Sequence, residues 1–173
     1  MIIKMIGVSF IVSASGWLGL YKASQLSHRT KVIRQLRMDL EFLEKEIGFS
    51  RNPLEQALSR TAGVSCEPNK GLFTKACREL RSEPSTTARE AWSKGVAHLS
   101  KSGALTDEDL NIISLIGERM GTSDVSDQVR MLRQAGTEMK IQEEKSLRRE
   151  GSEKKLWSYG GFLLGLMISI LLI

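Results

Sequence analysis

The sequence predicts an all-α protein: a six-helix antiparallel bundle flanked by an N-terminal and a C-terminal transmembrane helix. Three observations lead to this fold class. Apolar residues in the middle of the chain recur every three or four positions, which is the spacing of one face of a helix. The polar–apolar alternation typical of strands does not extend over any length. Two runs, residues 5–21 and 156–173, contain no Asp, Glu, Lys or Arg.

The predicted organisation has three parts. They are an N-terminal transmembrane anchor over residues 1–22, a cytoplasmic helical bundle over residues 23–155 and a C-terminal transmembrane helix over residues 156–173. A chain of 173 residues fits one such bundle, since domains typically contain about 100–200 residues. Two Cys and two His are too few for a disulfide scaffold and argue against a metal site built from these ligands.

The C-terminal run has the length and the flanks of a membrane span. Its 18 residues would extend about 27 Å as a helix, close to the ~30 Å hydrocarbon core of a bilayer. Trp157 and Tyr159 lie at its charged end, where aromatic rings favour the headgroup level, and Lys154 and Lys155 precede them. We therefore expect this segment to span the cell membrane.

The N-terminal run allows two interpretations. Val12-Ser13-Ala14 resembles a signal-peptide cleavage site. A signal peptide carries its positive charge in front, however, and only Lys4 precedes this run, whereas the other cations follow it. We favour an uncleaved anchor, because positively charged flanks stay in the cytoplasm. Six basic residues beside the two runs are expected at the membrane surface: Lys22, Arg29, Lys31, Arg34, Lys154 and Lys155.

Basic flanks on both sides of residues 23–155 predict that this domain is cytoplasmic and that both termini lie across the membrane. Cys66 and Cys77 would then face a reducing compartment and remain thiols. Small residues recur every four positions in both predicted spans, a spacing that lets helices approach closely in lipid. They are Ser15 and Gly19 in the first span and Gly161, Gly165 and Ser169 in the second. Ordinary span composition explains the same pattern, since Gly is common in such helices.

The first predicted bundle helix begins near residue 24 and ends at Gly48, which suits the left-handed position after a helix. Its apolar residues follow one stripe: Ile33, Leu36, Leu40, Leu43 and Ile47. Asn52-Pro53-Leu54-Glu55 predicts the start of a second helix, with Asn52 as its cap and Pro53 at its first position. We expect this helix to extend to about Ala62.

Periodicity predicts two further helices in the middle of the chain. The third covers about residues 69–81, and the fourth follows Pro84-Ser85. The expected inward residues of the third helix are Leu72, Phe73, Ala76 and Leu80. Those of the fourth helix are Ala88, Trp92, Val96 and Leu99.

Thr106-Asp107-Glu108-Asp109 predicts the start of a fifth helix, because Thr is a favoured cap and acids in a first turn complement the helix dipole. This helix is expected to end at Gly121, and the sixth to begin near Ser123-Asp124. The expected inward residues are Leu110, Ile113, Ile116 and Met120 in the fifth helix, and Val129, Leu132, Ala135 and Met139 in the sixth. An even number of alternating helices returns both ends of the bundle to the same membrane face.

The sequence predicts no active site. It contains no nucleotide-binding, zinc-protease or Cys-x-x-Cys motif, so we expect no enzyme activity, cofactor, metal or small-molecule substrate. His28 lies in the basic stretch, and His98 lies beside the apolar face of its helix, where a structural role is favoured. Nucleic-acid binding is not expected despite a pI of about 9.4, because the cations alternate with acids and no aromatic platform accompanies them.

Two charged groups are candidate interaction surfaces. Glu41, Glu44 and Lys45 lie off the apolar stripe of the first bundle helix. An ion pair between Arg37 and Glu41 would contribute only ~0.3–0.5 kcal/mol, too little to require these residues for folding. Asp107, Glu108 and Asp109 form the second group. Surfaces of this kind are suited to orienting a basic partner, although a solvated charged face is the favoured explanation for any one of these residues.

Several segments resemble the stage III sporulation protein AB family. They are residues 29–49, 53–58, 105–124 and 127–135, and the run GGFLLGLMISILLI at residues 160–173. The resemblance extends over essentially the whole chain in length, in the order of segments and in both hydrophobic ends. It is weakest between residues 62 and 102.

This resemblance implies a membrane protein of the mother cell in an endospore-forming bacterium. The family is similar to the F-type platform proteins of type II secretion systems. It implies a place in a channel-like complex between mother cell and forespore, with a cytoplasmic secretion-type ATPase, stage III sporulation protein AA, as partner. The other implied partners are ring components of the same complex, the lipid bilayer and further copies of the chain. The second function class left open is a membrane-anchored regulatory or binding module without a transport role.

Overall fold

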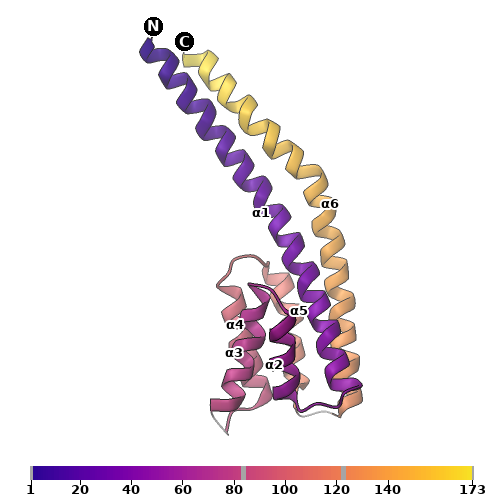
Figure 1. The fold of residues 1–173 in the computed structure, drawn as a ribbon. Helices are drawn as coiled ribbons and strands as arrows, with labels where there is room; N and C mark the ends of the chain where they lie inside the picture. Colours follow the sequence, from indigo (N-terminus) through magenta and orange to yellow (C-terminus); the bar gives the residue numbers. More distant parts are fainter. Residues whose placement is uncertain (1, 83–84, 122–123, 173) are drawn as a thin grey trace. The chain divides into compact units, whose positions relative to one another are not determined.

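The computed structural model describes residues 2–82, 85–121 and 124–172. These residues form six helices and no strand, which confirms the predicted all-α class, whereas the prediction has six bundle helices and two further terminal helices. In chain order (Figure 1) the helices are α1 (Ile2–Gly48), α2 (Leu54–Val64), α3 (Asn69–Ser82), α4 (Ala88–Ser100), α5 (Asp107–Arg119) and α6 (Val125–Leu172).

The first and last helices differ from the prediction. α1 contains 47 residues and α6 contains 48, so neither is divided into a terminal helix and a bundle helix near residue 23 or 155. Neither place contains a Pro. Gly151 lies close to the second place, but one Gly costs only about 1 kcal/mol relative to Ala in a helix, which is too little to end a long one.

The predicted transmembrane helices are not supported by the structure. Within the part of the chain that it describes, no helix combines the length and the apolar character needed to cross a membrane. Many side chains of the uncharged runs 5–21 and 156–173 lie outside the described residues.

The chain divides into two compact units. Residues 31–143 form one unit, which we call the core unit, and residues 1–30 with 144–173 form the other, the terminal unit. α1 and α6 each have one part in the core unit and one part in the terminal unit. The predicted domain boundaries, near residues 23 and 155, stay a prediction.

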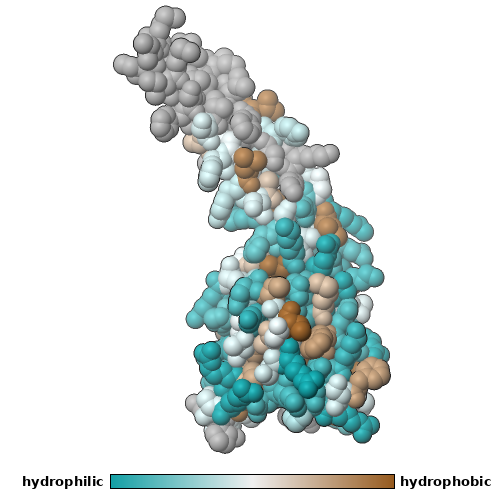
Figure 2. Space-filling view, in the orientation of Figure 1, coloured by the Kyte–Doolittle hydropathy of each residue, from teal (hydrophilic) through white to brown (hydrophobic). Residues whose placement is uncertain are grey.

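The core unit is built from the helix faces that periodicity predicts. α2 packs on α3, α3 on α4, and α4 on α5. All five apolar residues of the α1 stripe are buried. Other buried apolar residues are Leu58, Leu72, Phe73, Ala76, Trp92, Leu99, Ile113, Ile116, Leu132, Ala135 and Met139. The space-filling view of the same orientation shows a mostly hydrophilic surface over this unit, with apolar side chains in small patches (Figure 2).

Trp92 joins three helices of the core unit. Its indole Nε1 donates a hydrogen bond to the carbonyl oxygen of Ile113 on α5 at 2.8 Å. Its ring meets Phe73 on α3 edge to face, with 6.1 Å between the ring centroids. Gly117 makes room for the indole, since a Cβ there would lie 2.7 Å from Trp92 Cδ1. A buried Trp whose N–H is satisfied therefore fixes how α3, α4 and α5 pack.

The two predicted helix caps have different outcomes. Thr106 caps α5: its Oγ1 accepts from the backbone N–H of Asp109, whose carboxylate accepts from the Thr106 N–H at 2.9 Å. The predicted cap of α2 is wrong, because Pro53 takes the capping position and has no side-chain bond. Asn52 Nδ2 instead donates to Glu46 Oε2 at 2.7 Å. Asn52 therefore lies one residue before the capping position, and its side-chain amide binds the carboxylate near the end of α1.

In the terminal unit, the outer segments of α1 and α6 run antiparallel and meet through small polar side chains. The hydroxyls of Thr30 and Ser146 lie 2.9 Å apart, and the Ser27 hydroxyl donates to the Glu150 carboxylate. Ala23 is also buried. Hydrogen bonds between polar side chains therefore join the two segments.

Candidate interaction surface

The described residues offer no reaction centre built on a metal. No group of three or more His, Cys, Asp or Glu among them is placed to hold a metal ion. His98 is exposed in the last turn of α4, and its ring lies beside Gly71 of α3.

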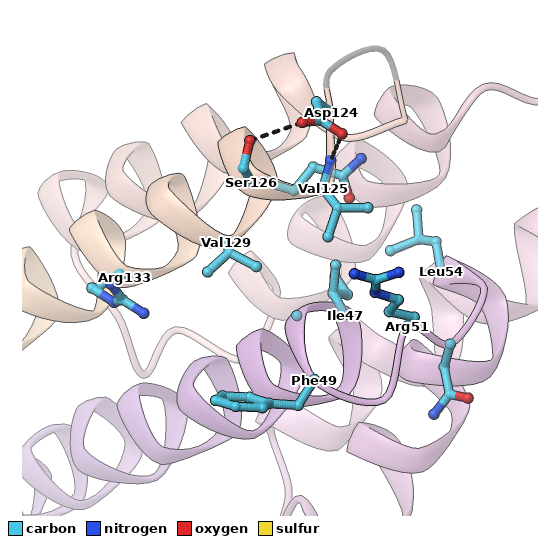
Figure 3. A pocket seen from close by; sticks show the side chains of 12 residues that line it. Ile47, Phe49, Arg51, Leu54, Asp124, Val125, Ser126, Val129 and Arg133 are labelled. Carbon is cyan, nitrogen blue, oxygen red and sulfur yellow. Dashed lines mark hydrogen bonds between the residues drawn. The ribbon is translucent and has the colours of Figure 1, made fainter.

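A pocket of about 820 Å³ lies in the core unit between the end of α1, the loop after it and the start of α6. Figure 3 shows Ile47 and Leu54 facing Val125 and Val129 across it. Phe49 lies at its edge, and its side chain is 89% exposed. Apolar walls beside an exposed aromatic ring suit an apolar side chain of a partner.

The turn after α1 gives the pocket its shape. Gly48 lets α1 end close to α6, because a Cβ at this position would lie 3.0 Å from Val129 Cγ2. The backbone N–H of Phe49 donates to the carbonyl oxygen of Lys45 at 2.9 Å. Arg51 then adopts a φ of 48°, a left-handed conformation that is uncommon for residues other than Gly.

Charged groups surround the apolar walls. Asp124 caps the start of α6: its carboxylate accepts from the Val125 N–H at 2.8 Å and from the Ser126 hydroxyl at 2.9 Å (Figure 3). Arg133 Nη2 binds Glu44 Oε1 at 2.6 Å. Arg51 has no ion-pair partner among the residues described. The pocket thus combines apolar walls with the cation Arg51, which is unpaired within the described residues.

Sequence reasoning missed this pocket. Phe49, directly after the Gly that ends α1, was the available signal, because an apolar residue there lies outside the apolar stripe. Val125 and Val129 are spaced by four at the start of α6 and only indicate a helix face. Periodicity does not distinguish such a face from the buried core.

The predicted acidic residues of α1 lie beside the pocket. Glu44 reaches the pocket through its ion pair with Arg133, which is one of the lining residues. Glu41 pairs with Arg37 at 2.6 Å, as the spacing of four predicts. Lys45 is exposed. This group therefore flanks one wall of the pocket.

The three predicted acidic residues at the start of α5 do not all lie on the surface. Asp107 is exposed, whereas Asp109 is fully buried in the cap of α5 and is unsuited to contact a partner. Glu108 accepts a hydrogen bond from Gln142 Nε2 of α6 at 2.7 Å. Asp107 and Glu108 are therefore the residues of this group that reach the surface.

The structure does not bring the acids of α1 and α5 together. Glu44 contacts α6 at Arg133, and Glu108 contacts it at Gln142. Nine residues of a helix correspond to about 13 Å along its axis and about half a turn around it. The two groups therefore meet different faces of α6.

The predicted membrane-surface cations have varied surroundings. Lys22 and Lys31 are exposed and Arg29 is half-buried. Arg34 and Arg37 both bind Glu143 of α6, with their Nε atoms 2.6 and 3.1 Å from its carboxylate oxygens. The side chains of Lys154 and Lys155 lie outside the described residues.

Glu143 is held ionised by these two arginines. Its burial raises the pKa of the carboxyl, but hydrogen bonds from Arg34 and Arg37 together outweigh burial and lower it.

Of the small residues predicted to pack the spans, Gly19 is buried and Ser15 half-buried, whereas Gly161, Gly165 and Ser169 have no described side-chain environment.

Two further acids in the core unit have pKa shifts of opposite direction. Burial raises the pKa of Asp39, which is 1% exposed. Gln35 Nε2 donates to its Oδ1 at 2.9 Å, but Asp39 Oδ2 and Asn69 Oδ1 have no hydrogen-bond partner in the described part of the chain. Glu79 instead has a pKa lowered to about 2, because two lysines donate hydrogen bonds to it.

Comparisons with known proteins give a consistent result. A family model described as stage III sporulation protein AB matches residues 4–173. A curated relative, stage III sporulation protein AB of Bacillus subtilis (strain 168), is 29% identical over 170 residues, which cover 98% of this chain and 99% of the relative. A solved structure of a stage III sporulation protein AB has a TM-score of 0.67 and 26% identity, and the match covers 72% of this chain and 98% of that one. The sequence match is therefore longer than the structural one.

Proposed function

Because the chain belongs to the stage III sporulation protein AB family, a family of sporulation proteins, we propose that it is a non-enzymatic membrane platform required for endospore formation. In this role it joins a cytoplasmic secretion-type ATPase, stage III sporulation protein AA, to the membrane and ring components of a channel complex between mother cell and forespore. The full-length family match, over residues 4–173, is the observation that carries the proposal.

A place in the mother-cell membrane is the first part of the proposal. It is supported by the sequence: residues 5–21 and 156–173 carry no charge, and cations flank both runs on the side of the core unit. Cations next to a span stay in the cytoplasm, so the core unit faces the compartment that contains ATP. An ATPase partner needs this arrangement.

A role without chemistry is the second part. A platform needs surfaces rather than a reaction centre, and the described residues present an open pocket with apolar walls but no metal-binding cluster. The ATPase contact is proposed to use the pocket together with Glu41 and Glu44. An exposed Phe49 would insert into the partner, and the acids would orient basic side chains around it.

The test is complementation in an endospore-forming bacterium that lacks its own family member. The full chain should restore heat-resistant spores and should sediment with the membranes of sporulating cells. A chain that restores sporulation from the soluble fraction would contradict the membrane part. Failure to restore sporulation, with the chain stably present in the membrane, would contradict the platform role.

The alternative, a membrane-anchored regulatory module, differs from a platform in whether the chain must bind the ATPase. A regulator need not bind the ATPase, whereas a platform must. Charge reversal of both Glu41 and Glu44 to Lys should therefore abolish ATPase binding and sporulation while leaving the helix content unchanged. Loss of sporulation with intact ATPase binding would favour the regulatory module.

A further inference from the structure

The side of α3 that borders α2 carries a basic stripe. Lys70, Thr74, Cys77 and Arg81 are spaced by four, three and four residues, which places them on one side of the helix. Arg78 lies beside them. Lys70 and Arg78 are exposed and have no ion-pair partner within the described ranges, whereas Arg81 binds Glu55 of α2 at 2.6 Å. Within the stripe Cys77 is buried and Thr74 is half-buried, so Lys70, with Arg78 beside it, supplies the unneutralised positive charge.

A groove of about 320 Å³ runs along this stripe. Its other wall, on α2, consists of Ser59, Ala62 and Gly63. A Cβ on Gly63 would meet no atom within 4 Å, so the space above it is open. Small residues on one wall and cations on the other suit a helix that carries acids, because such a helix can approach closely.

The outer face of α5 has the complementary pattern. Asp107, Asn111, Ser114 and Glu118 are all exposed and have the same spacing of four, three and four residues. Asp107 and Glu118 have no ion-pair partner in the part of the chain described. Leu115 flanks the stripe and is 54% exposed. Each stripe covers eleven residue steps, or about 16 Å of helix.

We propose that the α5 stripe of one copy of this chain docks antiparallel into the α2–α3 groove of a second copy. In this register Glu118 faces Lys70, Ser114 faces Thr74, and Asp107 faces Arg81. Antiparallel helices also align their dipoles favourably.

Such a contact links copies head to tail. α3 and α5 do not contact each other within the core unit, since both pack on α4, so one molecule cannot make this contact with itself. The two patches differ, which makes the contact heterologous, and a heterologous contact builds a ring or an open chain rather than a closed pair. The proposal concerns self-association and does not rest on the proposed platform role.

Cysteine cross-linking of the full chain in living cells tests the contact. Cys66→Ser and Cys77→Ala remove the native thiols, and Thr74→Cys with Ser114→Cys place a new pair at positions that face each other. Disulfides form only where the two Cα atoms lie about 4.4–6.8 Å apart. Treatment with a membrane-permeant oxidant should give a ladder of dimers, trimers and larger species on a non-reducing gel.

Matched variants define what the ladder means. Thr74→Cys or Ser114→Cys alone, and Thr74→Cys with Lys140→Cys on α6, should give no ladder. A dimer that forms with one of the single cysteines would indicate a symmetric contact and overturn the proposal. Absence of any cross-link in the facing pair, with the chain present and helical by circular dichroism, would also overturn it.

A charge swap tests the register. In the cross-linking background, Lys70→Glu should lower the cross-linked fraction by about three- to tenfold, because an exposed ion pair becomes a repulsion. Adding Glu118→Lys should restore it, and the control Lys140→Glu should leave it unchanged. If Lys70→Glu has no effect, or if Glu118→Lys fails to restore the ladder, Lys70 and Glu118 do not face each other and the proposed register is overturned.

Discussion

Replacing Gly95 by Ala is expected to destabilise the core unit, although Ala favours helices more than Gly does. Gly95 is buried inside α4. A Cβ at this position would lie 2.7 Å from the carbonyl oxygen of Leu72 and 3.3 Å from the Cβ of Ala76. Both atoms belong to α3, and the first is a backbone atom. The overlap can therefore be relieved only if α3 and α4 move apart.

Two effects of opposite sign set the magnitude. Ala gains about 1 kcal/mol over Gly inside a helix, and overpacking of a core costs about 1–3 kcal/mol or more. A contact this short with a rigid backbone belongs at the upper end of that range, so we expect a net loss of about 1–2 kcal/mol in the free energy of unfolding. Gly136 of α6 is the matched control, since a Cβ there would meet nothing within 4 Å. Gly136→Ala should therefore stabilise the protein by about 0.5–1 kcal/mol.

Urea denaturation of the full chain, followed by far-ultraviolet circular dichroism, measures both changes. The transition midpoint should fall for Gly95→Ala and rise for Gly136→Ala, with a difference of about 1.5–3 kcal/mol in the free energy of unfolding between the two variants. Equal stability of the two variants would refute the close approach of α3 and α4.

Four further predictions follow from the same structure. Burial raises the pKa of Asp39 above its ordinary 3.8, so the charged carboxylate destabilises the fold at neutral pH, and this destabilisation is absent below pH 3.8. In urea titrations, Asp39→Asn should therefore add about 1 kcal/mol to the free energy of unfolding at pH ~7. It should add nothing near pH ~3. The pKa of Glu79 is lowered from 4.5 to about 2, so its charge contributes stability above pH 4.5 that is lost as the pH falls through 2. Glu79→Gln should therefore be destabilising at neutral pH and match the wild type in strong acid. A difference in stability between variant and wild type that stays constant with pH would contradict the shift. Thr106→Ala should lower the free energy of unfolding by about 1 kcal/mol through loss of the α5 cap, and an unchanged melting temperature would argue against that cap. Phe49→Ala should change stability by less than ~0.5 kcal/mol but reduce the frequency of heat-resistant spores, whereas normal sporulation would exclude Phe49 from the proposed partner contact.

Most of the fold could be predicted because the core depends on periodicity. The five residues of the α1 stripe, from Ile33 to Ile47, are all buried, and the Thr106 cap forms as its sequence indicates. The continuity of α1 and α6 could not be predicted from a change in composition. A switch from uncharged to charged residues alters the solvent that a helix prefers, but without Pro it leaves the backbone hydrogen bonds intact.

The candidate surface was less predictable, because it depends on contacts between distant residues. Asp107 and Asp109 lie two residues apart, yet one is exposed and the other is buried in the cap. Asn52 carries a strong capping signal, but α2 begins one residue later than expected, and Asn52 binds Glu46 instead. The pocket beside Phe49 needs α6 to pack beside the end of α1, and no local pattern encodes that pairing.

Purification of the tagged full chain from cross-linked membranes of sporulating cells tests the central claim most directly. The platform proposal predicts that stage III sporulation protein AA is recovered with the wild-type chain and is lost from the variant with both Glu41→Lys and Glu44→Lys. Recovery of a membrane-bound chain without this ATPase, or equal recovery of the ATPase with the variant, would contradict the proposed platform contact.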